Sequence, residues 1–225
     1  MEIKEIGHLK TFFPTKFGAP RQSGIAKNSL ATLVFCEEHR APQALTGLEG
    51  YSHVWVIWGF SESKCEGFSP TVRPPRLGGN KRIGVFASRS PYRPNSLALS
   101  VLKLEGIEKT EKYGYVLKLS GADMMDGSPV YDIKPYLPFA DSIPDAKGGF
   151  TEALDDYILD VIIPENLKGK LSLELYDCLI DVLKNDPRPS YLDTPQRIFG
   201  FFFDKYEIKF TVEDKALTVI SIEEI

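Results

Sequence analysis

The sequence predicts a mainly β protein in which an N-terminal β-barrel domain, residues 1–140, is followed by a small α+β domain, residues 141–225. Short apolar segments recur through the first part, and Gly or Pro stands in almost every gap between them. No long helical pattern alternates with these segments, which argues against a doubly wound sheet and favours a barrel or a sandwich. The chain changes character after a Pro-, Gly- and Asp-rich passage at 135–149, which we interpret as a linker.

Six strands and one short helix are expected in the first domain. The helix at 42–48 should close at Gly47 or Gly50. The continuous apolar run at 54–58 predicts a strand that is buried on both faces. The six strands are expected at 3–9, 30–35, 52–60, 82–87, 98–107 and 113–120.

The second domain is expected to combine one helix with a small antiparallel sheet. Leucines recur at helical spacing through 171–184, and the helix should end before Asp186-Pro187 because the residue before a proline disfavours helix. Three strands are expected after it, at 198–203, 206–212 and 216–222.

The net charge of −4 hides an uneven distribution. Residues 1–140 hold 18 Lys and Arg against 13 Asp and Glu, a net charge of +5, whereas residues 141–225 carry a net charge of −9. No acid lies between Glu66 and Glu105. The cations of that stretch are Arg73, Arg76, Lys81, Arg82, Arg89, Arg93 and Lys103. A local basic surface on an acidic protein indicates a polyanionic partner, with nucleic acid as the leading candidate and a merely solvated loop surface as the alternative.

Several kinds of chemistry are disfavoured. The three cysteines, Cys36, Cys65 and Cys178, are scattered, and the absence of a CxxC or Cys/His cluster argues against a metal site and favours a cytoplasmic protein. The sequence has neither a P-loop nor a GxGxxG motif, which weakens ATP, GTP and NAD as ligands. No apolar run approaches the length of a membrane span, and the charged start is unlike a signal peptide.

The segment 84–95 is the strongest candidate for a binding loop. Its two prolines fix their own φ angles and bias the residues before them away from helix. The loop therefore presents Arg89, Arg93 and Asn95 with little entropy left to lose on binding. A guanidinium offers a planar fork of donors to a carboxylate or a phosphate. The alternative is a purely structural corner.

Three other loops carry polar groups in restrained settings. The segment 19–24 combines Pro and Gly with polar side chains that could hold the edge of a ligand. The segment 70–82 is lined by cations and suits an RNA backbone. In 186–191, Arg188 and Tyr191 could contact a phosphate and stack on a base. Each of these loops can equally be a turn or a linker.

A fourth segment, 123–138, combines a turn with an alternating polar face. Asp126-Gly127 predicts a tight turn between strands. Beyond it, Asp132, Lys134 and Tyr136 project to one face if the segment is extended. An acid, an amine and a phenol on one face form a candidate polar cluster. The alternative is a surface salt bridge, worth at most about 1 kcal/mol.

Taken together, these motifs resemble the TsaA-like methyltransferase family from about residue 3 to the C-terminus. The most specific are the stretches TVRPPRLGGN at 71–80 and DIKPYLPFA at 132–140. The resemblance implies a β-barrel unlike the Rossmann and knotted methyltransferases, S-adenosylmethionine as methyl donor, and a homodimer. It further implies tRNA as substrate, methylated on N6 of N6-threonylcarbamoyladenosine at position 37 in the anticodon loop.

The resemblance also assigns residues to the donor site. Ser61 and Glu62 stand where relatives often carry His and Gln, and 95–98 reads Asn-Ser-Leu-Ala where Asn-Pro-Ile-Gly is usual. The expected donor-binding residues are Pro20, Arg21, Gln22, Ser61, Glu62, Arg93, Met125, Asp126 and Gly127.

The chemistry of methyl transfer adds a second set of residues. A sulfonium donor requires in-line alignment and exclusion of water, and the poorly nucleophilic N6 requires a group that stabilises or removes its proton. Asp132, or Tyr136 acting with Lys134, is the expected base. Arg89 is expected to grip a carboxylate or a phosphate, and Asn95 to lie near the substrate. Two alternatives stay open: methylation of a small molecule on the same scaffold, and an RNA-binding module without turnover.

Overall fold

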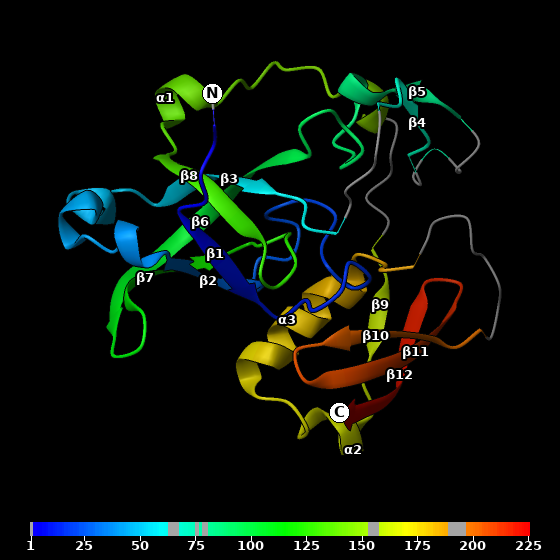
Figure 1. The fold of residues 1–225 in the computed structure, drawn as a ribbon. Helices are drawn as coiled ribbons and strands as arrows, with labels where there is room; N and C mark the ends of the chain where they lie inside the picture. The colour runs from blue at the N-terminus through cyan, green and yellow to red at the C-terminus, as the bar shows by residue number, and fades with distance from the viewer. Residues whose placement is uncertain (1, 63–67, 75–76, 78–80, 153–157, 189–196) are drawn as a thin grey trace.

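In the computed structural model, which describes residues 2–62, 68–74, 77, 81–152, 158–188 and 197–225, the first domain is a six-stranded antiparallel β-barrel (Figure 1). Its strands are β1 (Gly7–Thr11), β2 (Leu30–Phe35), β3 (His53–Gly59), β6 (Leu97–Thr110), β7 (Gly114–Ser120) and β8 (Pro129–Pro135). The hydrogen-bonded order is β1-β2-β7-β6-β3-β8, and two residue pairs between β1 and β8 close the ring. The predicted mainly β fold class is confirmed.

Strand β3 corrects one expectation. The apolar run was predicted to be buried on both faces, but only Val54, Val56 and Trp58 face the barrel core, whereas Trp55 and Ile57 are half-buried on the outside. A barrel strand alternates between core and exterior with a period of two residues. The continuous apolar run therefore reflects an apolar outer face rather than a second buried layer.

Six strand ends meet at one rim of the barrel. The antiparallel register brings the ends of β1, β3 and β7 beside the starts of β2, β6 and β8. The residue pairs that mark this rim are Thr11 with Ala31, Leu30 with Ser120, and Gly59 with Leu97. Three loops leave it and are called the rim loops below: 12–29, 60–96 and 121–128.

The shorter elements depart from the sequence-based expectations in detail. The strand predicted at 82–87 is only β5 (Ile83–Gly84), which pairs with β4 (Thr71–Val72) and runs into a 3-10 turn, η5 (Val85–Ala87). The helix predicted at 42–48 is instead a pair of 3-10 turns. Within the described ranges, the 3-10 turns also include η1 (Glu37–His39), η2 (Pro42–Leu45), η3 (Leu48–Gly50) and η6 (Gly149–Thr151).

The predicted linker at 135–149 is partly ordered structure. It opens with the end of β8 and contains a short helix, α1 (Pro138–Asp141). The carboxylate of Asp141 fixes this helix, because its Oδ2 accepts hydrogen bonds from Trp55 Nε1 at 2.9 Å and from the amide of Leu137 at 2.8 Å.

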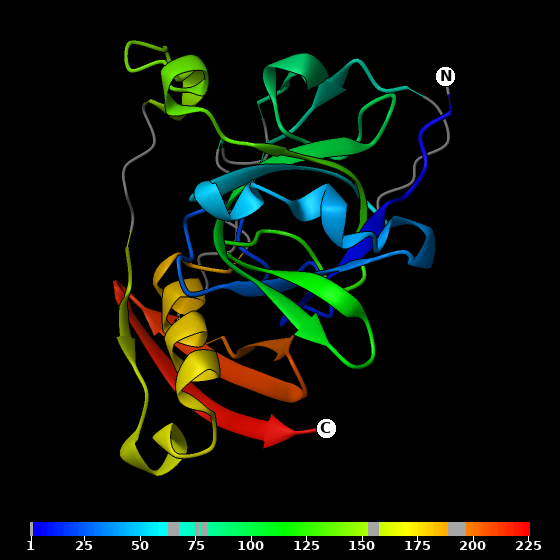
Figure 2. The same ribbon diagram turned by 90° about the vertical axis from the view of Figure 1, so that its left-hand side faces the viewer.

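The second domain is a four-stranded sheet packed against one long helix (Figure 2). Its sheet order is β10-β11-β12-β9, in which β9 is parallel to β12 and was not predicted, because three residues carry too little periodicity. Ser172 Oγ accepts from the amide of Leu175, so the long helix begins two residues later than expected. The elements are β9 (Asp160–Ile162), α2 (Glu165–Lys168), α3 (Leu173–Lys184), β10 (Phe199–Phe203), β11 (Tyr206–Glu213) and β12 (Ala216–Glu224).

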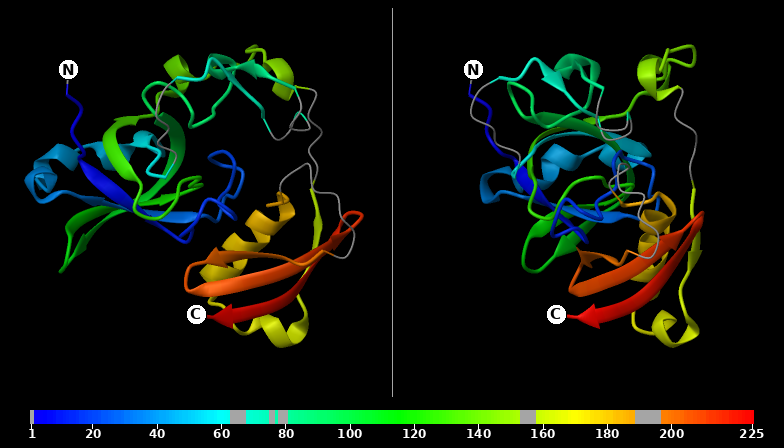
Figure 3. Two further views of the ribbon diagram at one scale, coloured as in Figure 1. Left: turned by 45° about the vertical axis from the view of Figure 1, so that its right-hand side comes forward. Right: turned by 90° about the vertical axis from the view of Figure 1, so that its right-hand side faces the viewer.

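The rim loop 12–29 ties the two domains together. Phe13 and Ala26 are buried in the core of the second domain rather than in the barrel core. The backbone amide and the side chain of Asn28 both donate to Asp181 Oδ2 at 3.0 Å. Figure 3 shows this blue segment between the barrel and α3. The sequence-based boundary near residue 140 therefore does not separate all the contacts of the two cores.

Candidate active site

A polar cluster joins the three rim loops. Arg89 Nη1 donates a 2.5 Å hydrogen bond to Gln22 Oε1, which connects loop 60–96 to loop 12–29. Asp123, in loop 121–128, interacts with the amide of Ser23 and with the charge of Arg89. Two residues predicted for the site, Gln22 and Arg89, are thus brought together, although they were expected in different roles.

Asp123 is the member of this cluster that the sequence did not reveal. Its Oδ1 accepts a 2.7 Å hydrogen bond from Ser100 Oγ, which in turn accepts one of 3.0 Å from Trp58 Nε1. Burial raises the pKa of Asp123 above its usual value, although Ser100, backbone amides and Arg89 oppose the shift. A lone acid in the run Gly-Ala-Asp-Met-Met gave no pattern to detect.

The candidate binding loop 84–95 is held by hydrogen bonds from its side chains to its own backbone carbonyls. Val85 is buried and anchors the 3-10 turn, and Ser88 Oγ donates to the Val85 carbonyl at 2.8 Å. Arg93 Nη1 donates to the Ser88 carbonyl at 2.9 Å, so one nitrogen of this predicted donor contact shapes the loop. Asn95 is exposed. Ser96 has a φ of 44° and its carbonyl accepts from the amide of Phe60 at 3.1 Å.

The predicted turn at Met125-Asp126-Gly127 is confirmed. Gly127 has a φ of 75°, a region that favours glycine, and the amide of Ser128 donates to the Met125 carbonyl at 3.2 Å. Asp126 Oδ1 accepts from the amide of Thr11 at 2.9 Å, which fastens the turn to the end of β1. Asp126 and Gly127 are exposed at the rim.

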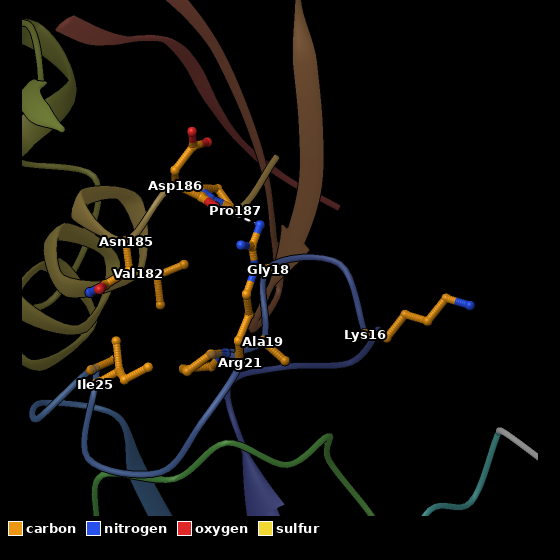
Figure 4. A pocket seen from close by; sticks show the side chains of 11 residues that line it. Lys16, Gly18, Ala19, Arg21, Ile25, Val182, Asn185, Asp186 and Pro187 are labelled. Carbon is orange, nitrogen blue, oxygen red and sulfur yellow. Dashed lines mark hydrogen bonds between the residues drawn. The ribbon is translucent and has the colours of Figure 1, made fainter. Parts of the chain in front are cut away.

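Pro20 and Arg21 line a crevice between the domains. It holds about 90 Å³, below the roughly 300–1,000 Å³ of typical ligand pockets. Arg21 Nη2 donates to the carbonyls of Asp186 at 3.1 Å and Arg188 at 2.5 Å. Figure 4 shows Arg21 extended toward Asp186 and Pro187, whereas Lys16 points away from them. The Arg21 guanidinium therefore connects the domains.

The last predicted donor contacts, Ser61 and Glu62, follow the end of β3 and are exposed. They lie at the same rim as the other loops. Arg188, predicted to contact a phosphate, is instead buried and forms a two-point ion pair with Asp186, with two distances of 2.8 Å. The predicted positions Cys65, Pro75, Arg76, Gly78, Gly79, Asn80, Pro189, Ser190 and Tyr191 lie outside the described residues.

The polar face predicted at Asp132, Lys134 and Tyr136 is present along β8 and directly after its end. Lys134 Nζ and Asp132 Oδ2 form a 2.8 Å ion pair, and Tyr136 packs its ring 5.8 Å from that of Trp55. The three side chains share the outer face of the barrel. Within the described part of the chain, no recorded contact joins Asp132, Lys134 or Tyr136 to Gln22.

An apolar surface adjoins this face. On the outside of β3 and β6, Trp55 lies opposite Val101 and Ile57 opposite Leu99, which is 53% exposed. The β8 register places Asp132 beside Ile57 and Lys134 beside Trp55. We call Trp55, Ile57, Leu99 and Val101 the outer apolar face.

The rim loops offer both signs of charge to a ligand. The guanidiniums of Arg89 and Arg93 suit a carboxylate, and the carboxylates of Asp123 and Asp126 suit cationic groups. None of these four residues takes part in the ion pairs found among the described residues. S-adenosylmethionine carries a carboxylate, an ammonium and a sulfonium, so this set of groups fits it. Neither a group of His, Cys, Asp and Glu able to hold a metal ion nor a helix able to cross a membrane occurs within the described ranges.

Comparison with known proteins gives the class to which this barrel belongs. Residues 8–142 match the model of the tRNA-methyltransferase O N-terminal domain, and residues 159–225 match that of the TrmO C-terminal domain. The barrel and its rim loops are therefore those of a β-barrel methyltransferase. The chain belongs to the tRNA-methyltransferase O family, which confirms the TsaA-like resemblance.

Relatives of known name match along the chain. The tRNA (adenine(37)-N6)-methyltransferase of Escherichia coli is 35% identical over 99% of this chain and 97% of its own. The protein of the same name from Eikenella corrodens is 48% identical over 76% of this chain and 95% of its own. The crystal structure of TrmO from Pseudomonas aeruginosa superimposes with a TM-score of 0.81 at 30% identity, covering 100% of this chain and 97% of that one.

Proposed function

We propose that this protein transfers the methyl group of S-adenosylmethionine to N6 of adenosine 37 in tRNA, and that this adenosine carries a threonylcarbamoyl group. The joining of three rim loops through Gln22, Arg89 and Asp123 is the observation that carries the proposal, because it creates a charged site from segments that the family resemblance assigns to donor and substrate binding. The names of the relatives from E. coli and E. corrodens supply the substrate. Such a substrate places the reaction in the cytoplasm.

The rim loops hold the donor in this proposal. The Arg93 guanidinium has nitrogens left after its bond to Ser88, and Asp126 keeps one oxygen that does not bond Thr11. These groups take the carboxylate and the amino group, while Met125 packs against the base. Gln22, Ser61, Glu62 and the exposed backbone of Gly127 complete the site.

The donor supplies a methyl carbon bonded to a positively charged sulfur, which leaves as a neutral thioether. The N6 lone pair forms the new N–C bond as the C–S pair returns to sulfur, and the N6 proton must be accepted. Asp132 accepts it in this proposal, because a carboxylate positioned for proton transfer contributes rate when N6 is poorly basic. Before the transfer, Lys134 Nζ, 2.8 Å from Asp132 Oδ2, holds the carboxylate in place, and Tyr136 lies along the same face.

In this proposal, a homodimer brings the base, Asp132, close to the donor site in the rim loops. Asp132 lies on the outside of the barrel, whereas Gln22, Arg89 and Asp123 lie at the rim. The outer apolar face beside Asp132 includes Leu99, more than half exposed, and an apolar surface of this kind favours a protein contact. We infer that it packs on a second copy, which sets Asp132 of one protomer near the rim of its partner.

The test is methyl transfer from labelled S-adenosylmethionine with purified tRNA present or replaced by RNA-free extract metabolites. Label should enter tRNA, and transfer should weaken as salt rises because phosphate contacts are lost. Asp132→Asn should lower turnover at least about tenfold, equal to about 1.4 kcal/mol of barrier, while Asp145→Asn, the same change at an exposed acid, leaves it unaltered. Label only in small molecules, or unaltered turnover in Asp132→Asn, contradicts the proposal.

A further inference from the structure

Two phenyl rings stack on each other at the protein surface. The ring centroids of Phe68 and Phe86 are 6.2 Å apart with an interplanar angle of 27°. Phe68 is 56% exposed and Phe86 is 72% exposed, and neither belongs to either hydrophobic core. Exposing so much aromatic surface to water costs free energy, which a binding partner recovers by covering it.

The hairpin beneath the rings is well anchored. Val85, directly before Phe86, is 1% exposed, and its amide donates to the Pro70 carbonyl at 2.9 Å. Strands β4 and β5 pair across the hairpin, and Arg82 Nη1 donates to Thr71 Oγ1 at 2.8 Å. The rings are therefore presented by a fixed support, so little ordering entropy is lost when a partner binds.

The sequence that carries the two rings is basic. Residues 67–104 contain no Asp or Glu. Among the described cations of this stretch, Arg73, Lys81, Arg82, Arg89 and Arg93 form no ion pair with any residue that the structure describes. Aromatic rings interleaved with unpaired cations are typical of single-stranded nucleic-acid sites, where bases stack and phosphates pair with the cations.

The rings also lie close to the rim cluster along the chain. Phe86 precedes Arg89 by three residues, which span at most about 11 Å when extended. Arg89 is the residue that bonds Gln22 across the rim. A nucleotide beside the methylated one is therefore within reach of Phe86.

We propose that Phe86 and Phe68 form a stacking platform for an unpaired base of the tRNA anticodon loop next to the target adenosine. This inference rests on the proposed function and adds the surface by which the loop is held. Protein recognition of RNA loops depends on splayed bases that stack on aromatic side chains, and a platform beside the target stabilises the extruded adenosine.

The test uses the full-length protein and an anticodon stem-loop of threonine tRNA, with affinity measured by fluorescence anisotropy. Phe86→Ala should weaken binding about tenfold and Phe68→Ala several-fold, whereas Phe86→Trp should retain it. Phe202→Ala is the matched control, since Phe202 is 41% exposed on β10 in the other domain. A stem-loop that lacks the base beside the target should bind wild type and Phe86→Ala equally.

Two readouts separate the possible failures. Binding of S-adenosylmethionine, by calorimetry, and oligomeric state, by light scattering, should be unchanged in Phe86→Ala. If wild type methylates tRNA but Phe86→Ala and Phe68→Ala bind the stem-loop normally, the platform is refuted and the proposed function stands. If Phe86→Ala changes the oligomeric state, the rings face a second copy and the inference is wrong. If wild type neither binds nor methylates tRNA, the proposed function itself falls.

Discussion

Arg89 Nη1 lies 2.5 Å from Gln22 Oε1, and this hydrogen bond joins two loops across 67 positions of the chain. Each loop is restrained on its own: Gln22 Nε2 bonds the Arg21 carbonyl, and the Arg89 loop is pinned through Ser88. Loops held in this way meet a ligand with little reorganisation, which is the basis of positioning catalysis.

The Gln22–Arg89 hydrogen bond predicts that the losses of S-adenosylmethionine affinity on changing either residue are coupled. Gln22→Ala and Arg89→Ala should each weaken S-adenosylmethionine binding, and the double variant should lose less than the sum, with a coupling energy of roughly 0.5–3 kcal/mol. Calorimetric titration of the four proteins measures it. Strictly additive losses would mean that the two residues act independently and that their hydrogen bond does not organise the site.

Asp123 predicts a pH-dependent stability difference. Because burial holds its folded-state pKa above the ordinary 3.8, the folded protein binds more protons than the unfolded chain, and stability falls as pH rises from 3.8 through the raised pKa. Asp123→Asn removes this decline. The free energy of unfolding of the variant minus that of wild type should therefore increase as the pH rises from 3.8 through the raised pKa. Urea unfolding monitored by tryptophan fluorescence reports on the barrel, since both tryptophans, Trp55 and Trp58, lie on β3.

The control for that measurement is Asp145→Asn, at an exposed acid outside the barrel strands. The difference in free energy of unfolding between Asp145→Asn and wild type should be the same at every pH. If the difference for Asp123→Asn is also independent of pH, the Asp123 carboxylate of wild type is not the buried group described above.

The Arg21 hydrogen bonds predict that the link between rim loop 12–29 and the second domain contributes to the stability of the fold. Arg21→Ala removes hydrogen bonds from a guanidinium to two carbonyls of the segment after α3 and should lower the free energy of unfolding by about 1–2 kcal/mol. Lys16→Ala, in the same crevice but pointing away, should change it by less than about 0.5 kcal/mol. Calorimetric melting measures both, and equal stabilities would show that the crevice contact does not hold the domains.

Local signals in the sequence were enough for the barrel but not for all of the site. Five of the six barrel strands, the turn at Asp126-Gly127 and the loop 84–95 follow from alternation, Gly and Pro, whereas β8 was not among the expected strands. Asp123 could not be predicted as a site residue, because a single acid has no periodicity. Its place in the site depends on the fold, in which β6 brings Ser100 beside it. The two roles of loop 12–29, in the rim and in the second core, likewise depend on contacts between distant segments.

The outer apolar face predicts a dimer that a single charge breaks. Leu99→Glu should yield a monomer by light scattering, with methyl transfer lost and the fold retained by circular dichroism, because an ionised carboxylate cannot be buried there without a partner. Ile220→Glu, the same kind of change at an exposed apolar residue of β12 in the second domain, is the control. A Leu99→Glu protein that is as active and as large as wild type removes the dimer from this account.

Mixing variants tests whether the protomers share the site. Asp132→Asn and Arg89→Ala proteins, each weakly active, should recover activity when they are combined and exchanged, because a mixed dimer holds one site with both residues intact. If activity does not recover although subunit exchange has been verified, Asp132 and Arg89 belong to the site of the same protomer.

The most direct measurement is nucleoside mass spectrometry of threonine tRNA after incubation with the protein and S-adenosylmethionine bearing a deuterated methyl group. We expect the deuterated methyl on N6 of threonylcarbamoyladenosine at position 37, and none when the same tRNA lacks the threonylcarbamoyl group. Methylation at another position, or no methyl on the RNA at all, would contradict the assignment of this charged barrel rim to adenosine 37.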